Sequence, residues 1–505
     1  MNDSRHPGLS PALVADMEAK GIDIGLSLEL LEGINAGRLG MDPPVRASGV
    51  PALDGRSVLD LSATESWLVG RNEARDRLAA LGLALPGGRE AADGMIAFDR
   101  ATLAELGQRL FERTAWGVLN GGSATSYADR KKNGSIGPGV FDAIREGFEL
   151  LAPLCENRPK GITPAYLNPD GSPGESFLVL KMRASLVQAA RWRERFGTPD
   201  RPVLPFFQMT SAGTDGPLAE AYMRYAEHPW LAGLIERSGT DPTRPRSAVQ
   251  PLMAAYTHSS EGMPKRVFDR AWGKADSSIA LPGGHGQSFR VLRDIYAGLL
   301  SDGYRFAYLG NVDNTGYYPD PVELAVMALS GAETSCEFSF RTPVDVKGGI
   351  LVHDQNGKKT IAELGQAMSL AEAERLQAEG KPILFNCATG IFDLALLVPR
   401  LDELSRRLPL RVSDQDKDAG RYSQAEQGTW EVLGLLDDPL FFAVSKSERF
   451  IAAKLLAETV LASGAVRPEA LPRDVADTAA SLSAGMNRFL AGPCRLVLRD
   501  GRWTL

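Results

Sequence analysis

Between about residue 116 and residue 455, short apolar runs alternate with longer segments of helical periodicity. The apolar runs are 117–119, 203–207, 306–309, 337–340 and 383–385, and the helical patterns between them include 185–196, 216–237, 289–302 and 321–330. Alternation of this kind predicts an α/β domain with a mixed, mostly parallel sheet flanked by helices. In such sheets ligands bind beyond the carboxyl ends of the strands, so we expect functional residues there.

The segments on either side of this domain have a different character. Residues 1–115 are predicted as a helical N-terminal region, because Ser62–Glu65 forms a capping box ahead of Trp67, Leu68 and Leu78, and a second helical pattern covers 101–114. Residues 456–505 are predicted as a short C-terminal region with helices and a strand candidate at 494–498. We therefore expect a central α/β domain at 116–455 between two accessory regions.

The bulk composition excludes several classes of protein. A net charge of −7 over 505 residues argues against a nucleic-acid partner, which usually leaves a basic surface. The four cysteines show no C-x-x-C spacing, which favours reduced thiols over a zinc site or disulfides. No apolar stretch approaches the ~20 residues of a membrane span, and the first residues lack the apolar core of a signal peptide. We expect a cytoplasmic protein with no membrane partner.

A glycine pair directly follows the first predicted strand, in Leu119–Thr125. Glycines permit positive φ angles and close approach, so that successive N–H groups can converge on phosphate oxygens. An ordinary tight turn is an equal alternative for this segment alone. Further along, Arg158–Gly161 holds a lysine beside a rigid proline, which suits a triphosphate but is more often a surface turn.

Three later segments add a base loop, a carboxylate and another lysine. Leu281–Gly286 gathers a proline and three glycines around one histidine, so a planar base could lie against its backbone. Asn311–Asn314 follows a strand end and contains a carboxylate placed for Mg²⁺, which shares oxygen ligands with substrate phosphates; an Asx turn is the alternative. Asp345–Gly349 carries a lysine next to two glycines and is, alone, more often a plain loop.

In this order the segments resemble the UTP:sugar-1-phosphate uridylyltransferases, the family of UDP-glucose pyrophosphorylase and UDP-N-acetylhexosamine pyrophosphorylase. The resemblance covers about residues 116–455. Its matched segments are the glycine loop Asn120–Thr125, Pro159-Lys160, Met209-Thr210-Ser211 with Thr214, Gln250, Gly284-His285-Gly286, Asp313, Lys347–Gly349, Phe385-Asn386, Gln424 with Glu426, and Arg449–Lys454. The resemblance implies a Rossmann-like, GT-A-like nucleotidyltransferase fold.

The family resemblance also implies a role for each matched residue. Asp313 would hold Mg²⁺, while Lys160 and Lys454 would neutralise phosphates as the catalytic lysines. The implied nucleotide-binding residues are Asn120, Gly121, Gly122, Thr125, Gln250, Gly283, Gly284 and His285. The implied sugar-phosphate-binding residues are Asn311, Asn314, Glu337, Lys347, Gly348 and Asn386. The substrates would be UTP and a sugar 1-phosphate, giving a UDP-sugar and pyrophosphate.

A sugar phosphate needs no general base, because its second pKa near ~6 leaves it ionised at neutral pH. A reaction without a general base agrees with this sequence, whose five histidines are scattered and form no serine–histidine motif. About 35 residues separate the glycine loop from Pro159-Lys160, more than in the family, so Lys131 or Lys132 is an alternative for the nucleotide phosphates. Glucose 1-phosphate is the first-choice sugar, followed by N-acetylhexosamine or broad-range specificity. A relative that binds nucleotide sugars without turnover, and a purely structural α/β protein, remain open, as does the oligomeric state.

Overall fold

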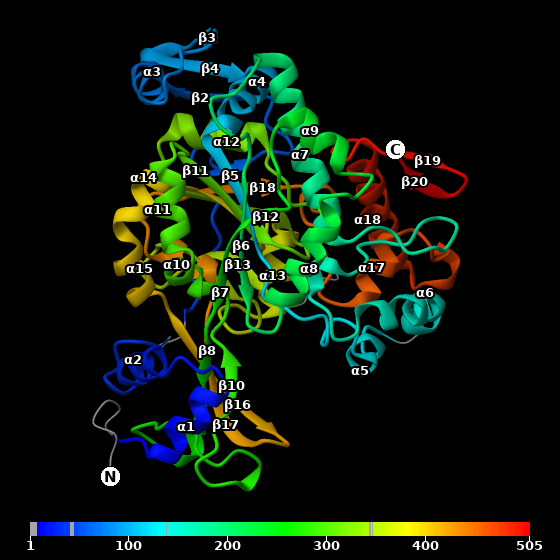
Figure 1. The fold of residues 1–505 in the computed structure, drawn as a ribbon. Helices are drawn as coiled ribbons and strands as arrows, with labels where there is room; N and C mark the ends of the chain where they lie inside the picture. The colour runs from blue at the N-terminus through cyan, green and yellow to red at the C-terminus, as the bar shows by residue number, and fades with distance from the viewer. Residues whose placement is uncertain (1–7, 41–44, 138, 343–344, 346) are drawn as a thin grey trace.

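The computed structural model describes residues 8–40, 45–137, 139–342, 345 and 347–505. The first seven residues, whose sequence contributed to the expectation of a cytoplasmic protein, lie outside the described residues, and so does Val346 of the Asp345–Gly349 segment. A central sheet occupies the middle of the molecule, with helices packed around it and a smaller group of strands below it (Figure 1).

The central sheet has ten strands, and eight of them form its main path. Their order is β1 (Val58–Asp60), β18 (Leu440–Val444), β12 (Thr334–Phe340), β15 (Leu384–Asp393), β11 (Phe306–Asn311), β5 (Thr114–Leu119), β6 (Phe206–Ser211) and β7 (Arg246–Gln250). Neighbours on this path are parallel except where β15 pairs with β11 and β12. The hairpin β13 (Gly349–His353) and β14 (Lys359–Glu363) extends the sheet from β15. The predicted mixed, mostly parallel sheet is confirmed.

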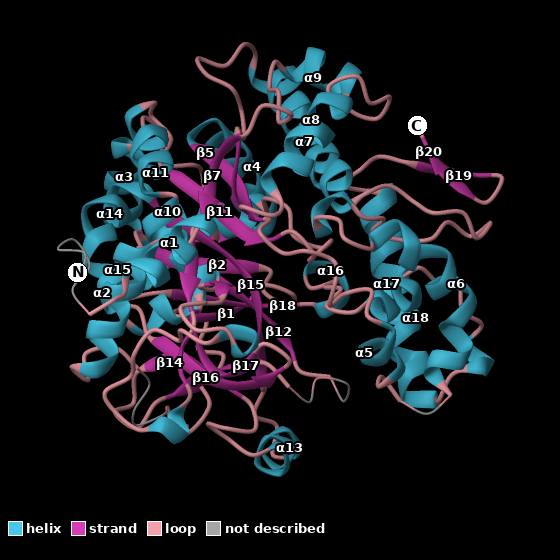
Figure 2. Ribbon diagram, turned by 60° about the horizontal axis from the view of Figure 1, so that its bottom comes forward, coloured by secondary structure: helices cyan, strands magenta, loops and turns pink. Residues whose placement is uncertain are grey.

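Strand β5 illustrates why these residues form a doubly covered sheet. All six of its residues are buried, and successive side chains point to opposite faces. Trp116 and Val118 join one apolar core, which includes α4 (Arg100–Leu110), α6 (Val140–Cys155), α7 (Phe177–Phe196) and α12 (Pro321–Ser330). Ala115 and Leu119 join the other, with α10 (Ser288–Val291), α11 (Arg293–Ser301), α14 (Leu394–Leu397) and α15 (Leu401–Arg407). Helices therefore cover both faces of the sheet (Figure 2).

The prediction of a helix directly after the capping box at Ser62–Glu65 is wrong, because a strand follows it. Residues 66–70 form β2 (Ser66–Gly70), which pairs with β4 (Met95–Asp99), and β3 (Arg89–Glu90) completes this small sheet. Trp67 and Val69 are buried whereas Leu68 is 47% exposed, a period of two that belongs to a strand. Helix α3 (Arg71–Ala80) begins only after β2, and α4 occupies the second predicted helix. Because β1 also joins the central sheet, residues 1–115 are not purely helical.

Two predicted helices are each interrupted. The pattern over 216–237 divides into α8 (Asp215–Tyr225) and α9 (Ala232–Ser238), and the pattern over 289–302 divides into α10 and α11. Helix α12 covers the predicted range 321–330 without interruption. Long amphipathic patterns thus located the helices but not the breaks within them.

A smaller β-rich extension lies below the central sheet, next to the N-terminal helices α1 (Pro11–Ala19) and α2 (Ile24–Asn35) (Figure 1). It contains the pair β8 (Leu252–Ala254) and β10 (Ala280–Pro282), and the three strands β9 (Tyr256–Thr257), β16 (Leu410–Lys417) and β17 (Gly420–Gln427). Ser27 of α2 binds this extension, since its Oγ accepts from the N–H of Ala254 at 3.0 Å and its carbonyl accepts from the Tyr256 hydroxyl at 2.8 Å. The N-terminal helices therefore support the extension.

The C-terminal region packs beside the central domain. Helices α17 (Leu456–Ala462) and α18 (Arg473–Ala491) contribute apolar side chains to the core that also holds α6, and α5 (Arg130–Gly134) lies nearby (Figure 2). The strand expected at 494–498 begins at Val497, as β19 (Val497–Arg499), and pairs with β20 (Arg502–Thr504). Among the described residues, no helix has the length and apolar character needed to cross a bilayer. The domain limits at 115/116 and 455/456 stay predictions.

Candidate active site

The ends of several central strands meet at one edge of the sheet. Strands β11, β5, β6 and β7 are parallel neighbours, so the segments that begin at Asn311, Asn120, Ser211 and Gln250 leave the sheet side by side. Strand β15 runs in the opposite direction, and therefore its beginning, near Asn386, lies at this same edge. The fold thus brings together segments that are far apart in the sequence.

A cavity of about 640 Å³ opens at this edge. Nine of the residues given a site role from the sequence line it: Gly284, His285, Asn311, Asp313, Asn314, Lys347, Gly348, Asn386 and Lys454. Glu426 of the matched Gln424–Glu426 pair also lines it from β17, together with Glu363 of β14, Arg411 of β16, Gln427 of β17 and the following residues 428–431. The side-chain oxygen Oδ1 of Asn311 is buried and has no hydrogen-bond partner among the described residues, so this acceptor is available to a ligand.

Lys160 and Asp313 form an ion pair inside this edge, although 153 positions separate them in the sequence. The Lys160 ammonium lies 2.7 Å from a carboxylate oxygen of Asp313, and the two side chains are only 11% and 19% exposed. The Tyr127 ring lies 4.6 Å from the Lys160 nitrogen and adds a cation–π contact. The pair joins two of the segments on which the sequence-based hypothesis depends.

The long insertion between the glycine loop and Lys160 does not separate them in space. Ser123 forms a β-bridge with Pro159, and the Lys160 N–H donates to the Gly122 carbonyl at 3.1 Å. The intervening chain forms α5 and α6 and then returns to the loop. On α5, the Lys132 ammonium instead donates to the exposed Ser126 hydroxyl at 2.8 Å. The geometry therefore favours Lys160 over Lys132 for a phosphate at the cavity.

The electrostatic balance at Asp313 keeps its carboxylate ionised. Burial alone would raise its pKa, but Lys160, with smaller contributions from His285 and Lys454, lowers the pKa below its ordinary value. Lys454 belongs to a segment that docks on the Asp313 loop, where the Ala453 N–H donates to the Asp313 carbonyl at 3.2 Å and Asn314 forms a β-bridge with Ala452. A negative charge and two lysines are thus held at one place.

Side chains of β6 and the following turn donate hydrogen bonds to the glycine loop. The Ser211 hydroxyl donates to the Gly121 carbonyl at 2.8 Å, and the Thr214 hydroxyl donates to the Asn120 carbonyl at 3.3 Å. Asn120 is fully buried and donates from Nδ2 to Gln208 Oε1 at 3.1 Å, so its side chain supports the loop from within the protein. A Cβ on Gly122 would meet no atom within 4 Å, and Thr125 is exposed, which leaves the outer side of the loop open.

Gln250 connects the glycine loop to the Gly283–Gly286 loop. Its Nε2 donates to the Gly284 carbonyl at 2.8 Å, and its Oε1 would lie 3.4 Å from a Cβ placed on Gly121. Gly284 has a φ of +82°, and a Cβ there would lie 2.4 Å from the Gln427 carbonyl oxygen. This position therefore requires glycine, and the loop is held between Gln250 and β17.

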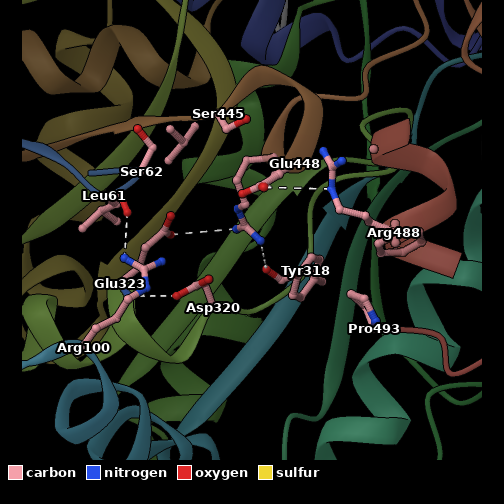
Figure 3. Close-up of a pocket in the computed structure, with 14 residues that line it drawn as sticks. Leu61, Ser62, Arg100, Tyr318, Asp320, Glu323, Ser445, Glu448, Arg488 and Pro493 are labelled. Atoms are coloured by element: carbon pink, nitrogen blue, oxygen red, sulfur yellow. Dashed lines mark hydrogen bonds and ion pairs between the residues drawn. The ribbon is translucent and has the colours of Figure 1, made fainter. Parts of the chain in front are cut away.

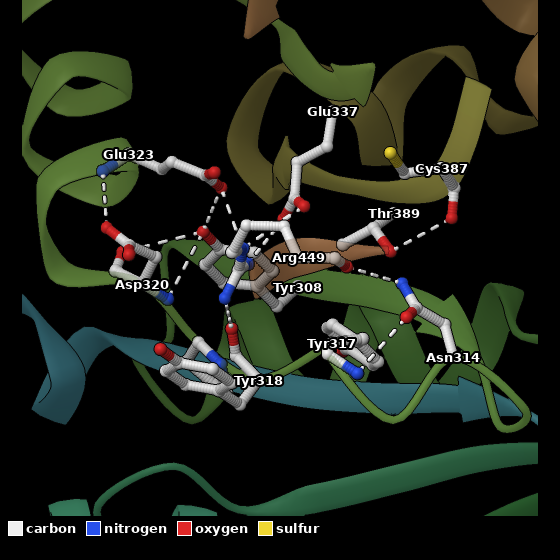
Figure 4. Close-up of polar contacts among 12 residues, drawn as sticks. Tyr308, Asn314, Tyr317, Tyr318, Asp320, Glu323, Glu337, Cys387, Thr389 and Arg449 are labelled. Carbon is white, nitrogen blue, oxygen red and sulfur yellow. Dashed lines mark hydrogen bonds and ion pairs between the residues drawn. The ribbon is translucent and has the colours of Figure 1, made fainter. Parts of the chain in front are cut away.

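Glu337, one of the predicted sugar-phosphate-binding residues, does not line the 640 Å³ cavity. It is fully buried in β12, and its carboxylate accepts a hydrogen bond from Nε of Arg449 at 3.2 Å (Figure 4). Glu323 of α12 lies in the same buried group and accepts from the Tyr308 hydroxyl at 2.5 Å. Burial raises the pKa of both Glu323 and Glu337. Two adjacent carboxylates away from water need a cation, and Arg449 supplies it.

This buried group connects to the cavity through Asn314, whose Nδ2 donates to the Arg449 carbonyl at 2.9 Å (Figure 4). Lys181 supports the same loop from α7, where its buried ammonium donates to the carbonyls of Asn314 and Tyr317. Burial lowers the pKa of Lys181 to about 7. Sequence analysis assigned no role to Lys181 or Arg449, although a lone lysine within the apolar run 177–182 is a usable signal.

A second cavity, of about 390 Å³, adjoins this buried group (Figure 3). Glu323 and Arg449 line it, together with Arg100, Tyr318 and Arg488. Arg100 donates to the Leu61 carbonyl at 2.7 Å, and Arg488 lies 4.0 Å from Glu448. Its cations are therefore already engaged, and none of the predicted nucleotide-binding or sugar-binding residues lines it.

A family model described as UTP–glucose-1-phosphate uridylyltransferase matches residues 266–451, which include the base loop, Asp313, Lys347 and Arg449 but not Lys454. The match covers less than half of the chain, and over these residues the chain is similar to that family. A Schizosaccharomyces pombe protein named "Probable UTP--glucose-1-phosphate uridylyltransferase" is 26% identical over 230 residues, which are 44% of this chain and 40% of that protein. A Dictyostelium discoideum protein named UTP–glucose-1-phosphate uridylyltransferase 2 is 32% identical over 107 residues, 21% of each chain.

The aligned segments thus span less than half the length of these relatives. Among solved structures, a UDP-glucose phosphorylase from Trypanosoma brucei superimposes with a TM-score of 0.54 at 18% identity, covering 90% of this chain and 77% of that one. At this identity the likeness concerns the fold alone. The resemblance predicted from the sequence and the predicted fold class are both confirmed.

The residues present fit a magnesium ion that arrives with its substrate. Among the described residues, no group of three or more histidine, cysteine, aspartate or glutamate side chains could hold a metal by itself. Asp313 offers a single ionised carboxylate at the cavity, and Mg²⁺ is usually bound by one or two carboxylates, substrate phosphates and water. These residues would therefore suit an ion shared with a bound phosphate, and they do not form a complete protein cage.

Proposed function

We propose that this protein is a UTP:sugar-1-phosphate uridylyltransferase that forms a UDP-sugar and pyrophosphate. The observation that supports this most strongly is the 2.7 Å pair between Lys160 and Asp313 beside the glycine loop, because it gathers cations and a carboxylate where phosphates would meet. The family match over 266–451 supports the same chemistry. Glucose 1-phosphate is the first-choice sugar, in line with the names of the matched relatives.

The proposed reaction is an in-line displacement at the α-phosphorus of UTP. A phosphate oxygen of the sugar 1-phosphate forms the new bond to phosphorus, while the bond to the bridging oxygen of the β-phosphate breaks and pyrophosphate leaves. Lys160 and Lys454 would neutralise phosphate charge, and alignment of the two anions would supply much of the rate. Mg²⁺, held by Asp313, would neutralise further charge on the reacting phosphates when bound.

The base and the sugar would occupy different parts of the cavity. Gln250 and the Gly283–Gly286 loop would hold uracil, since Gln250 already fixes the Gly284 carbonyl. Asn311, Asn314, Lys347, Gly348 and Asn386 all line the cavity and would contact the sugar phosphate. The broad-range and N-acetylhexosamine specificities are the alternatives within the same chemistry.

Pyrophosphate release from UTP, Mg²⁺ and a panel of sugar 1-phosphates tests the proposal and identifies the sugar. Release that requires both substrates supports it. A rise in melting temperature with UTP but no pyrophosphate with any sugar would instead identify a non-catalytic nucleotide binder. The absence of both would indicate a structural α/β protein.

A further inference from the structure

One wall of the 640 Å³ cavity carries three carboxylates and a single guanidinium. Nε of Arg411 on β16 donates to Glu431 at 2.6 Å, and its Nη1 donates to Glu363, at the end of β14, at 3.0 Å. Glu426 on β17 lies directly across from Arg411 in the β16–β17 register. All four residues line the cavity. We call this group the Arg411 wall.

The Arg411 wall has an excess of negative charge. Arg411, Glu363 and Glu431 together have a formal charge of −1, because one guanidinium is shared between two carboxylates. Glu426 brings the formal charge of the wall to −2. Within the described parts of the chain, Glu426 has an amide partner, Gln424 Nε2 at 3.1 Å, but no cation at ion-pair distance. Glu431 is buried, whereas Glu426 is exposed at the open side of the wall. Desolvation raises the pKa of both carboxyls, although Arg411 acts in the opposite direction.

The other residues that line the cavity indicate which part of a substrate would contact the Arg411 wall. The base loop is held by Gln250, and the phosphates belong with Lys160, Asp313 and Lys454. The remaining charged and amide lining includes Asn386, Lys347 and the Arg411 wall, with Ile361 and Trp430 among its apolar neighbours, so the sugar ring would lie there. Lys347 is exposed, and among the described residues it forms no ion pair with the three carboxylates.

Resting on the proposed function, we propose that the Arg411 wall restricts the enzyme to sugar 1-phosphates whose ring bears no second anionic group, and so rejects uronic acid 1-phosphates and sugar bisphosphates. Neutral hydroxyls donate hydrogen bonds to carboxylates, and charge-assisted bonds of this kind are strong. A ring carboxylate or second phosphate would be repelled, and repulsion of this kind is a common source of specificity. A ring ammonium, as in glucosamine 1-phosphate, is tolerated.

The test compares kcat/KM for glucose 1-phosphate, glucuronic acid 1-phosphate and the methyl ester of the latter, which has nearly the same size without the charge. Two unit charges ~6 Å apart at an effective dielectric constant of ~40 interact by enough to change a rate about tenfold. We therefore expect glucuronic acid 1-phosphate to be used at least ~10-fold less well than its methyl ester. High salt should narrow this ratio, because it screens partly exposed charges.

Glu426→Gln should reduce the ratio of kcat/KM for the methyl ester to kcat/KM for glucuronic acid 1-phosphate at least ~3-fold. The substitution removes one negative charge from the Arg411 wall without breaking an ion pair. Glu146→Gln, on the exposed face of α6, removes the same net charge elsewhere and should leave the ratio unchanged. Equal use of the acid and its ester, or a ratio that neither salt nor Glu426→Gln alters, would overturn the inference while the uridylyltransferase assignment stands. No turnover with any sugar 1-phosphate would remove the proposed function and this inference with it.

Discussion

Replacing Lys160 by methionine tests the most informative contact in the site. The substitution keeps a long side chain over the Tyr127 ring but removes the ammonium that lies 2.7 Å from Asp313. Loss of one charged contact to developing phosphate charge in a water-poor site costs on the order of 10²–10³-fold in kcat, or about 3–4 kcal/mol. We expect a loss of that size in pyrophosphate release.

The same substitution also has a cost in stability. Removing one partner of a buried ion pair costs about 3–5 kcal/mol, whereas an exposed pair contributes about 0–1 kcal/mol. With side chains 11% and 19% exposed, the Lys160–Asp313 pair lies between these limits, and we expect the free energy of unfolding to fall by about 1–3 kcal/mol. Urea denaturation measures this change separately from the assay, so a loss of activity in folded protein can be recognised.

Lys132→Met is the matched control, because the Lys132 ammonium donates to the exposed Ser126 hydroxyl and lies on α5, away from Asp313. We expect less than a threefold change in activity for this variant. The reasoning is refuted if Lys160→Met stays within threefold of wild type while Lys131→Met or Lys132→Met loses ~10²-fold. That result would transfer the phosphate contact to α5.

Three further predictions concern Asp313, Lys454 and Lys181. Asp313→Asn should abolish Mg²⁺-dependent turnover in a protein that still unfolds cooperatively, and near-normal activity would remove Asp313 from the metal role. Lys454→Ala should lower kcat by ~10²-fold or more, and a loss below threefold would show that this lysine makes no contact in the transition state. Burial lowers the Lys181 pKa to about 7, so between pH 7 and about 10 Lys181 is protonated in the unfolded chain but largely neutral in the folded protein. The free energy of unfolding should therefore rise with pH in that window, by at most about 1.4 kcal/mol per pH unit. Lys181→Met should flatten the pH dependence of urea unfolding between pH 7 and 9; an unchanged slope would contradict a largely neutral Lys181.

Much of the fold follows from local patterns in the sequence. The α12 range 321–330 and the strand ends that precede Asn120 and Asn311 were predictable, because apolar runs and caps are local signals. Residues 66–70 were not, since a five-residue alternation beside a capping-box motif is ambiguous until the partner strand β4 is known. The breaks between α8 and α9 and between α10 and α11 likewise depend on tertiary packing.

In the candidate site, too, local motifs were predictable from the sequence, whereas contacts between distant segments were not. Asp313, Lys454 and the base loop were identified from motifs, and the structure places them around one cavity. The burial of Glu337 could not be predicted, because a motif does not report which face of a strand a side chain occupies and its buried partner Arg449 lies 112 positions away. Glu426 of the Arg411 wall belongs to a matched sequence segment, but the other three residues escaped sequence analysis, since Glu363, Arg411 and Glu431 meet only when β14, β16 and the segment after β17 are assembled.

The central claim is that distant segments form one cleft that transfers a uridylyl group between phosphates. The most direct measurement is pyrophosphate release by the purified wild-type chain with UTP, Mg²⁺ and glucose 1-phosphate, each omitted in turn. The account predicts release only when all three are present, with the UDP-sugar formed in equal amount. Binding of UTP without any pyrophosphate, across the whole panel of sugar 1-phosphates, would contradict it.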